Sequence, residues 1–509
     1  MSQHDEMNIQ IIATSDMHSH ILNESEHSNI YRAGTYINEV RRQHDHVVLL
    51  DNGGNLAGSI TAFYYAIIAP YKRHPMIKLM NAMAYDASGI SSNEFKYGLD
   101  FLNRSIALAR FPWLSANIEY SRTREPYFST PYMVKNINGL KIAVVGLTSE
   151  GLMKNENIEM ESDVTVEKAT VAAKRWIRYI YETVEPEFLI VLYHGGLSKL
   201  SHDSKSQGEN QAEMIMKQVG IIDLMITGHQ HETVIENDGD TLFVQAGQNA
   251  ENLVHVNVKF RKRRNSFELL EMEPEIVSLN EYEEDQSLLD LTYYDRKAVR
   301  SWKNEPIHHH DIDMYFSHFH ELLVRPHPYI QLLHESLVQE LEATMTCVNL
   351  PLPNATGLKG GLKNEDIYNM YPHPDKPMDM TLKGSVIKQL IEESAAHLEW
   401  DGNHLTVGDM DPTHFLFWSG FDFTIDINQP PYYRVTQFGL HEDYSYRIVM
   451  TDYIYRHYKD ILPDVTLHQT YPVTMPELIA KVLKQQLEIK RPKSNMGSLS
   501  TSVGETITH

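Results

Sequence analysis

Four apolar runs in the first half of the chain limit its fold most strongly. They are HVVLLD (46–51), LKIAVVGLTS (140–149), FLIVLYHGG (188–196) and IIDLMITGH (221–229), and an amphipathic segment, ATVAAKRWIRYIYETV (169–184), lies between two of them. Continuous apolar, β-branched runs are typical of parallel strands buried on both faces and covered by helices. The pattern predicts an α/β domain, and the polar residues that end each run predict a ligand site at the carboxyl edge of the sheet.

A chain of 509 residues is too long for one hydrophobic core, and its character changes after about residue 275. The segment EYEEDQSLLDLTYYDRKAVRSWKNE (281–305) predicts a charged connecting helix, although a solvated helix inside one domain fits its composition equally well. A second α/β region follows, with a helix expected to begin near Lys383. We expect a first domain at 1–278, a connector at 279–306, a second domain at 307–490 and a disordered tail at 491–509.

Charge and cysteine content exclude several classes of protein. The net charge of −23 argues against recognition of a nucleic-acid backbone, although it leaves a small anionic ligand possible. The single cysteine, Cys347, excludes a disulfide framework and a cysteine-based metal cluster. The start MSQHDEMN lacks the basic and apolar regions of a signal peptide, and no apolar stretch is long enough for a bilayer. We therefore expect a cytoplasmic protein with a small-molecule partner, rather than nucleic acid or membrane, and the oligomeric state stays open.

Aspartate and histidine follow three strand-like runs. Asp16 and His18 follow NIQIIATS (8–15), His194 ends FLIVLYH, and His229 and His231 follow LMITG. In an extended segment, side chains two residues apart point the same way, so Asp16 with His18, and His229 with His231, can each converge on one point. Three strand ends of a parallel sheet would bring these side chains together, and imidazoles with a carboxylate suit Zn²⁺ or Mn²⁺. Each histidine taken alone fits a capping or solvent-exposed residue at least as well.

Eight segments, in a fixed order, carry a more specific resemblance. They are ATSDMHSHIL, LLDNGGNLAGS, SSNEFKYGLDFL, WLSANI, VVGLTSE, YHGG, ITGHQHE and VQAGQNAENL. In this order they resemble the blocks of the bacterial 5′-nucleotidase / 2′,3′-cyclic-nucleotide phosphodiesterase family. The later IYNMYPHPDKPMDMTLKGSVIKQLIEES and FWSGFDFTIDINQPPYYRV resemble that family's C-terminal domain. The resemblance implies a four-layer α/β/β/α metallophosphatase domain joined by a helix to a second α/β substrate-binding domain.

The resemblance also implies two metal ions at the strand ends. The first would be held by Asp16, His18 and His231, and the second by His194 and His229. Where the family pattern has a bridging Asp, an Asn ligand and a catalytic His–Asp pair, this chain has Gly54, Ser92, Asn93 and Lys96. Glu94 and Phe95 of the same block remain, which indicates that the fold was kept while the chemistry changed.

The loss of the bridging carboxylate changes the expected metal content. Two dications about 3.5–4 Å apart repel by roughly 17–19 kcal/mol at an effective dielectric constant of about 20, before their ligands compensate. Gly54 offers no charge to offset this repulsion, and Asp51 or Asn55 would have to swing into its place. We therefore expect at most one tightly bound ion, Zn²⁺, Mn²⁺ or a similar metal, at Asp16, His18 and His231.

The second domain departs from the family pattern at its substrate residues. Asn349 is the residue that matches in the family's Asn-Gly-Gly-x-x-Arg segment, His373 replaces the first of two base-stacking rings, and Tyr453 supplies the second. These three residues are the predicted substrate contacts, because His and Tyr rings can still stack on a base. Simple packing roles explain the two rings equally well.

The sequence as a whole predicts a divergent metal-dependent phosphoesterase that hydrolyses a nucleotide or another small phosphate ester. Asn93 marks the altered catalytic position. The alternative is a non-catalytic protein that keeps the fold and binds or senses a nucleotide-like small molecule.

Overall fold

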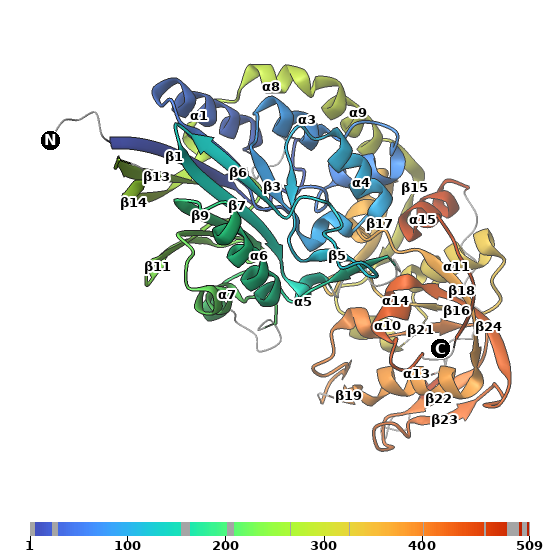
Figure 1. Ribbon diagram of the computed structural model, residues 1–509. Helices are drawn as coiled ribbons and strands as arrows, with labels where there is room; N and C mark the ends of the chain where they lie inside the picture. The colour runs from blue at the N-terminus through green and yellow to red at the C-terminus, as the bar shows by residue number, and fades with distance from the viewer. Residues whose placement is uncertain are drawn as a thin grey trace. The chain divides into compact units, whose positions relative to one another are not determined.

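A computed structural model describes residues 6–22, 29–153, 163–200, 208–264, 266–324, 326–400, 402–462, 465–485, 498–500 and 506–507. The chain divides into two compact units, Met1–Val299 and Arg300–His509 (Figure 1). The region predicted to connect two domains contains helices α8 (Gln286–Leu291) and α9 (Tyr293–Lys303), and the division falls inside α9. Most of the tail predicted to be disordered lies outside the described residues, and two short strands, β26 (Ser498–Ser500) and β27 (Thr506–Ile507), pair with each other within it.

Two six-stranded sheets form the centre of the described part of the first unit. The first has the order β14 (Phe267–Ser278), β13 (Asn252–Lys262), β1 (Glu6–Thr14), β2 (Val47–Asp51), β3 (Ala87–Gly89), β4 (Trp113–Leu114). The second has the order β11 (Thr233–Asp238), β12 (Thr241–Ala246), β10 (Leu224–Thr227), β9 (Phe188–His194), β7 (Leu140–Thr148), β6 (Tyr132–Ile137). The strands predicted at 46–51, 140–149, 188–196 and 221–229 are confirmed as β2, β7, β9 and β10.

Alternate side chains of the central strands enter two different cores, which is why the strands are apolar throughout. In β1, Ile11 and Ala13 pack between the two sheets, whereas Ile12 packs under helices on the outer face. In β7, Val144 packs between the sheets and Val145 lies on the outer face. A strand that is buried on both faces cannot show the polar alternation of a half-exposed strand.

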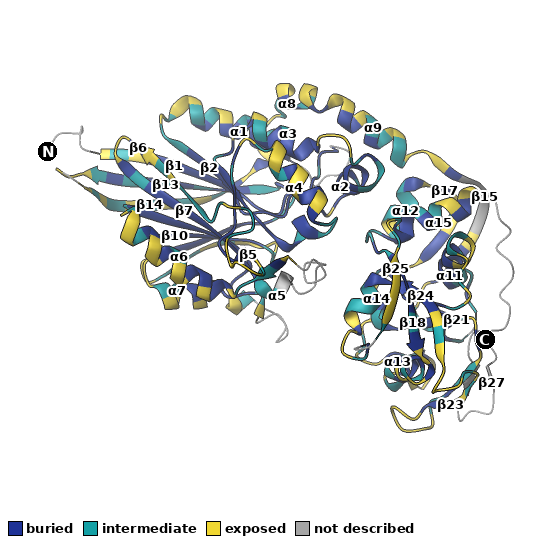
Figure 2. Ribbon diagram, turned by 45° about the vertical axis from the view of Figure 1, so that its right-hand side comes forward, coloured by how far each residue is buried: buried dark blue, intermediate teal, exposed yellow. Residues whose placement is uncertain are grey.

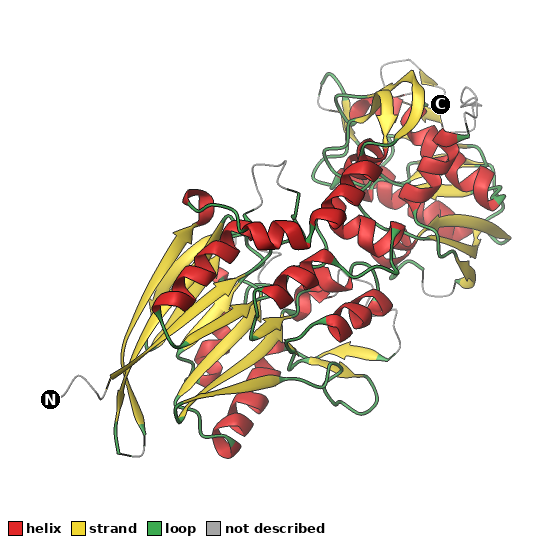
Figure 3. Ribbon diagram, turned by 90° about the horizontal axis from the view of Figure 1, so that it is seen from above, coloured by secondary structure: helices red, strands yellow, loops and turns green. Residues whose placement is uncertain are grey.

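Helices cover the outer face of each sheet and complete four layers. Helices α1 (Ile30–Gln43), α3 (Pro75–Ala82) and α4 (Leu99–Leu108) pack on the first sheet, and α6 (Ala169–Thr183) and α7 (Ala212–Val219) pack on the second. Figure 2 shows the buried strands between helices whose outer faces are exposed, and Figure 3 shows the same layers from above. The helix predicted at 169–184 and the four-layer α/β/β/α fold are confirmed.

The carboxyl ends of parallel strands from both sheets lie at one edge of the first unit. Strands β1, β2, β3 and β4 are mutually parallel in one sheet, and β7, β9, β10 and β12 are parallel in the other. The sequence predicted that the metal-ligating residues follow strands of one sheet, and this was wrong, because β1 belongs to the first sheet and β9 and β10 to the second. Apolar runs do not reveal which of two facing sheets a strand joins.

The second unit is built around a five-stranded sheet with the order β21 (Phe417–Ser419), β16 (Thr346–Val348), β24 (Ser445–Thr451), β18 (Pro377–Lys383), β25 (Thr466–Thr470). Helices α11 (Pro328–Leu341), α13 (Gly384–Ala396) and α15 (Met475–Lys484) share one hydrophobic core with this sheet. The helix predicted to begin near Lys383 is confirmed, since α13 begins at Gly384 and has Lys383 as its N-cap.

Gly146 permits the two sheets to approach closely. A Cβ atom at this position would lie 2.2 Å from the carbonyl oxygen of Leu114, which is a backbone atom that cannot rotate away. We predict that Gly146→Ala lowers the free energy of unfolding by about 1–3 kcal/mol, as overpacking of a core does. Gly208→Ala is the matched control, because no atom lies within 4 Å of its Cβ position. Equal stability of the two variants by chemical denaturation would contradict this explanation.

Candidate metal centre

The Asp16 carboxylate is buried, and three imidazoles surround one of its oxygens. Asp16 Oδ1 lies 3.5 Å from His194 Nε2, 3.7 Å from His231 Nε2 and 3.9 Å from His18 Nε2. These distances are too long for good hydrogen bonds, and Oδ1 has no hydrogen-bond partner. Ligands that each lie about 2.0–2.2 Å from one tetrahedral ion are themselves about 3.3–3.6 Å apart. The spacing around Oδ1 therefore fits a divalent cation.

The second oxygen of Asp16 is held by the protein itself. Ser15 Oγ donates to Oδ2 at 2.5 Å, and the backbone N–H of His229 donates to it at 3.1 Å. Burial alone would raise the pKa of Asp16, but His194, His231 and His18 outweigh that effect and hold its pKa below the ordinary value. The carboxylate is thus ionised, with one oxygen oriented by hydrogen bonds and the other available to a cation.

Asp16, His18 and His231 form a group that can hold a metal ion, since one ligand atom from each lies within 4.8 Å of the others. It is the one group of three or more acidic, histidine or cysteine side chains of this kind among the described residues. The sequence predicted the same three residues as ligands. Burial lowers the pKa of His18, so its imidazole is neutral near pH 7, which is the form that binds metals.

These residues converge through left-handed backbone turns and not through extended segments. The φ angles are 53° at Asp16, 51° at His18, 72° at His229 and 59° at His231. Positive φ is uncommon for residues other than glycine and gathers at functional sites, where surrounding structure offsets the strain. The extended geometry expected from the sequence was therefore wrong, although the convergence of Asp16, His18 and His231 it predicted is present.

Backbone contacts hold the Asp16–His18 segment in this conformation. The N–H of Asp16 donates to Gly53 O, and the N–H of His18 donates to Gly54 O, both at 2.8 Å. Asn249 supports the segment from the other side, because its N–H donates to Asp16 O at 2.8 Å and its Oδ1 lies 3.0 Å from His18 Nδ1. Such a contact fixes the imidazole so that Nε2 faces the metal. The sequence did not predict Asn249, although it lies shortly after the end of β12, as ligands lie after other strands.

His194 and His229 lie beside this group and contact different partners. His194 is buried, and its Nδ1 lies 2.8 Å from Asn52 O. The ring centroids of His194 and His229 are 6.4 Å apart, and burial lowers the pKa of His229 to about 4. His229 Nε2 lies 3.5 Å from Glu209 Oε2, a carboxylate that the sequence did not predict because it follows no strand. Within this pair, His194 thus faces Asp16 and His229 faces Glu209, each at 3.5 Å.

An aspartate at position 54 would require a change of backbone. The φ of Gly54 is +83°, and a Cβ atom there would lie 2.9 Å from both Asp16 Cα and Asp16 Oδ1. Asp51 is no substitute, because Gly53 N, Asn55 Nδ2, Ser88 Oγ and Thr14 Oγ1 all donate to its carboxylate. Burial raises the pKa of Asp51 to about 6, although these hydrogen bonds act in the opposite direction. The local structure therefore favours a site without a bridging carboxylate.

Glu94 has a structural role in the loop beside the Asp16 carboxylate. Its fully buried carboxylate accepts hydrogen bonds from the backbone N–H groups of Gly54, Asn55, Leu56 and Ser91 at 3.3, 2.5, 3.3 and 2.8 Å. The Ser91 hydroxyl donates to it as well. Glu94 thus fastens the 54–56 loop to the short helix η3 (Ser92–Phe95), and that loop in turn holds Asp16 and His18.

Ser92 and Asn93, two of the positions that the sequence resemblance marks as altered, lie on the same short helix, and Lys96 follows it. Ser92 is buried, whereas Asn93 and Lys96 are half-buried. The N–H of Asn93 donates to Ser91 Oγ at 3.1 Å, as part of the N-terminal cap of η3. An amide side chain can donate a hydrogen bond, but it does not release a proton near neutral pH, so Asn93 cannot replace a general acid.

Two of the three predicted substrate residues of the second unit meet at one turn. The Nδ2 of Asn349 donates to Leu350 O and Thr413 O at 2.9 Å each, and Thr413 Oγ1 lies 3.2 Å from the hydroxyl of Tyr453. Asn349 is buried, and these two hydrogen bonds use both N–H groups of its amide. The rings of Tyr453 and His457 are nearly parallel, with an interplanar angle of 11°. His373 is half-buried in the loop between α12 (Asn364–Met370) and β18.

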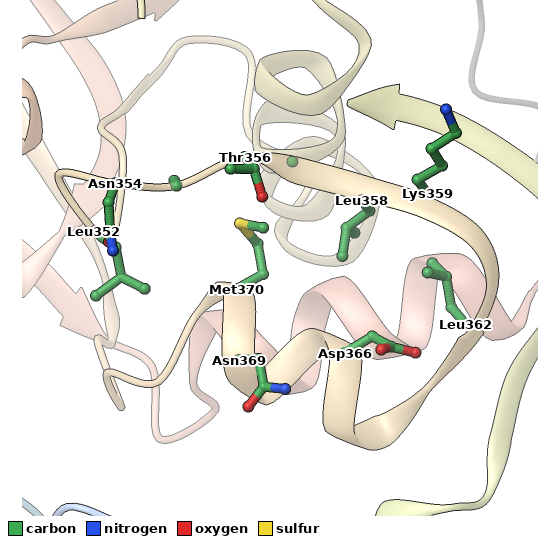
Figure 4. A pocket seen from close by; sticks show the side chains of 11 residues that line it. Leu352, Asn354, Thr356, Leu358, Lys359, Leu362, Asp366, Asn369 and Met370 are labelled. Carbon is green, nitrogen blue, oxygen red and sulfur yellow. The ribbon is translucent and has the colours of Figure 1, made fainter. Parts of the chain in front are cut away.

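The second unit contains a pocket of about 290 Å³ between α12 and the segment after Asn349 (Figure 4). Its lining includes Leu352, Asn354 and Thr356 from the loop and Asn369 and Met370 from α12. In Figure 4 the side chains of Thr356 and Met370 extend toward one another, whereas Lys359 extends away from α12. The loop with two prolines that departs from the family's glycine-rich segment thus forms one wall of a mixed polar and apolar pocket.

Comparisons with known proteins agree with this architecture. The model of the calcineurin-like phosphoesterase family matches residues 9–233, and the model of the 5′-nucleotidase C-terminal domain matches residues 318–461. A 2′,3′-cyclic-nucleotide 2′-phosphodiesterase/3′-nucleotidase of Yersinia enterocolitica is 24% identical over 499 residues, which cover 84% of this chain and 74% of the relative. Protein UshA of Escherichia coli is 28% identical over 231 residues, covering 44% of this chain and 41% of the relative.

Solved structures show the same fold along nearly the whole chain. The crystal structure of a putative 5′-nucleotidase from Staphylococcus aureus covers 97% of this chain and 100% of its own, with a TM-score of 0.75 and 22% identity. The first unit is accordingly a calcineurin-like phosphoesterase domain, a class that binds divalent metal ions. The chain as a whole belongs to the family of two-domain 5′-nucleotidase and nucleotide phosphodiesterase metallophosphoesterases. Among the described residues, no helix combines the length and apolar character needed to cross a membrane.

The structure predicts that Glu94→Gln weakens both stability and metal binding. The new NH₂ group would face backbone N–H donors, which should cost about 1–3 kcal/mol of unfolding free energy. Because the 54–56 loop holds the Asp16–His18 segment, Zn²⁺ affinity should fall about 10–100-fold, as it does when outer-shell contacts are lost. Exposed Glu182→Gln, which removes a contact with Arg178 only, is the control. Unchanged Zn²⁺ affinity in Glu94→Gln would show that this support is not needed.

Proposed function

We propose that the protein is a divergent phosphoesterase that hydrolyses a nucleotide or another small phosphate ester with one tightly bound divalent ion, Zn²⁺ or Mn²⁺. The single observation that carries this proposal is the buried Asp16 Oδ1, which has no hydrogen-bond partner and lies 3.5–3.9 Å from three imidazole nitrogens. A buried charge without a partner is costly, so a site of this kind is kept for a cation.

The roles of the residues follow from their contacts. Asp16, His18 and His231 would hold the ion, which when bound polarises a phosphoryl oxygen and lowers the pKa of water. Asn249 orients His18, and Ser15 orients Asp16. His194 and His229 would contact the phosphate group or a second, weakly held ion. Asn93 would donate a hydrogen bond but no proton, so leaving-group protonation would depend on the solvent or the substrate.

Because a general acid typically contributes about 10²–10⁴ in rate, turnover should be low and should depend on the leaving group. An ester with a good leaving group, such as p-nitrophenyl phosphate, should therefore be hydrolysed faster than a nucleoside monophosphate. The names of the relatives support nucleotides as the natural class of substrate for this chain. Asn349, His373 and Tyr453 are proposed as contacts of the organic part of that substrate.

The test is phosphoesterase activity of the full chain with added Zn²⁺ or Mn²⁺. Asp16→Asn should lose at least about 100-fold in kcat/KM, because the charged ligand is removed while the side chain keeps its shape. Asn93→Gln should change the rate little, since neither amide acts as an acid. Absence of activity in the wild type with every metal and substrate would favour the alternative, a binding or sensing protein. Full activity of Asp16→Asn would refute the assigned metal site.

A further inference from the structure

A second pocket in the first unit is lined by three basic side chains, of which one is paired with a described acidic group. It has a volume of about 600 Å³ and lies between α3, the carboxyl end of α4 and Leu291 of α8. Its basic residues are Arg73, Lys78 and Arg110. The pocket shares no lining residue with the metal centre, and we refer to it as the α3–α4 pocket.

Two of these cations are free of ion pairs within the described part of the chain. Lys78 is paired, because its Nζ lies 2.7 Å from Asp295 Oδ2. Arg73 and Arg110 are exposed, and no described carboxylate lies within ion-pair distance of either. The chain carries a net charge of −23, so two unpaired arginines on one pocket create a positive field that opposes the charge of the rest of the protein.

A buried histidine adds a hydrogen-bond donor without a partner. His74 lines the α3–α4 pocket and is 2% exposed. Its Nδ1 accepts a hydrogen bond from the N–H of Met76 at 3.3 Å, so the proton of the neutral ring lies on Nε2. Nε2 is buried and has no hydrogen-bond partner. Burial lowers the pKa of His74 to about 3, so the ring is neutral near pH 7. The N–H at Nε2 therefore has no acceptor in the described part of the chain.

The remaining wall of the pocket is apolar and includes Ile77, Leu108 and Leu291. The guanidinium group of arginine can donate two hydrogen bonds at once to phosphate oxygens. A cavity of several hundred Å³ is large enough for a small organic molecule. From the two unpaired arginines and the apolar wall that line one cavity, we propose that the α3–α4 pocket binds a small organic phosphate at a site separate from the metal centre. This inference goes beyond the proposed function and does not require that the chain be an active enzyme.

The test uses phenylphosphonate, whose carbon–phosphorus bond a phosphoesterase does not hydrolyse. Binding to the full chain is measured by calorimetry in the presence of a chelator, which removes the metal centre as a source of the signal. The wild type should bind the probe saturably at millimolar concentration or below, and more tightly than inorganic phosphate. Arg73→Gln combined with Arg110→Gln should weaken binding at least about tenfold, because two charge-assisted contacts are lost.

Arg104→Gln combined with Arg122→Gln is the matched control, since both residues are exposed, neither lines the pocket and the net charge changes equally. This control should bind within about twofold of the wild type. Folding of every variant is checked by circular dichroism. Equal binding by the two double variants, or no saturable binding by the wild type, would overturn the proposal, and neither result bears on whether the metal centre is active.

Discussion

The buried carboxylate of Asp16 imposes a requirement that the surrounding structure is built to meet. A carboxylate removed from water needs hydrogen bonds or a cation, and only one of its two oxygens receives hydrogen bonds from the chain. Three imidazoles face the other oxygen, and two of them, His18 and His231, lie with Asp16 in one group that can hold a cation. The four-layer fold supplies these groups by placing the ends of parallel strands from two sheets at one edge.

The segment that carries Asp16 is held in place by residues that would not contact the metal or the substrate. Glu94 holds the 54–56 loop, that loop and Gly53 hold the backbone of Asp16 and His18, and Asn249 holds them from the opposite side. All of these contacts except that between the side chains of Asn249 and His18 use backbone groups, and they hold a conformation with positive φ that these residues seldom adopt. Glu94 therefore has a structural role that does not depend on the chemistry of its neighbours Ser92 and Asn93.

Much of this arrangement follows from sequence alone, and the exceptions share a physical cause. Apolar runs buried on both faces identified β2, β7, β9 and β10. The resemblance to the nucleotidase family, and not the spacing of the residues, grouped Asp16, His18 and His231. The left-handed turns, the separation of the strands into two sheets, Asn249 and Glu209 were not predicted. They depend on contacts between residues that are far apart in the chain, such as Asn249 with Asp16, and local periodicity carries no information about such contacts.

The number of tightly bound metal ions tests this account most directly. The structure has one oriented carboxylate, no bridging carboxylate at Gly54 and an Asp51 whose oxygens are fully engaged. Elemental analysis of the full chain, after loaded protein is separated from weakly held ions, should return about one divalent ion per chain. His229→Ala should retain that ion, and His18→Ala should lose it. Two tightly bound ions per wild-type chain would contradict the account, because a second carboxylate would then have to complete the site.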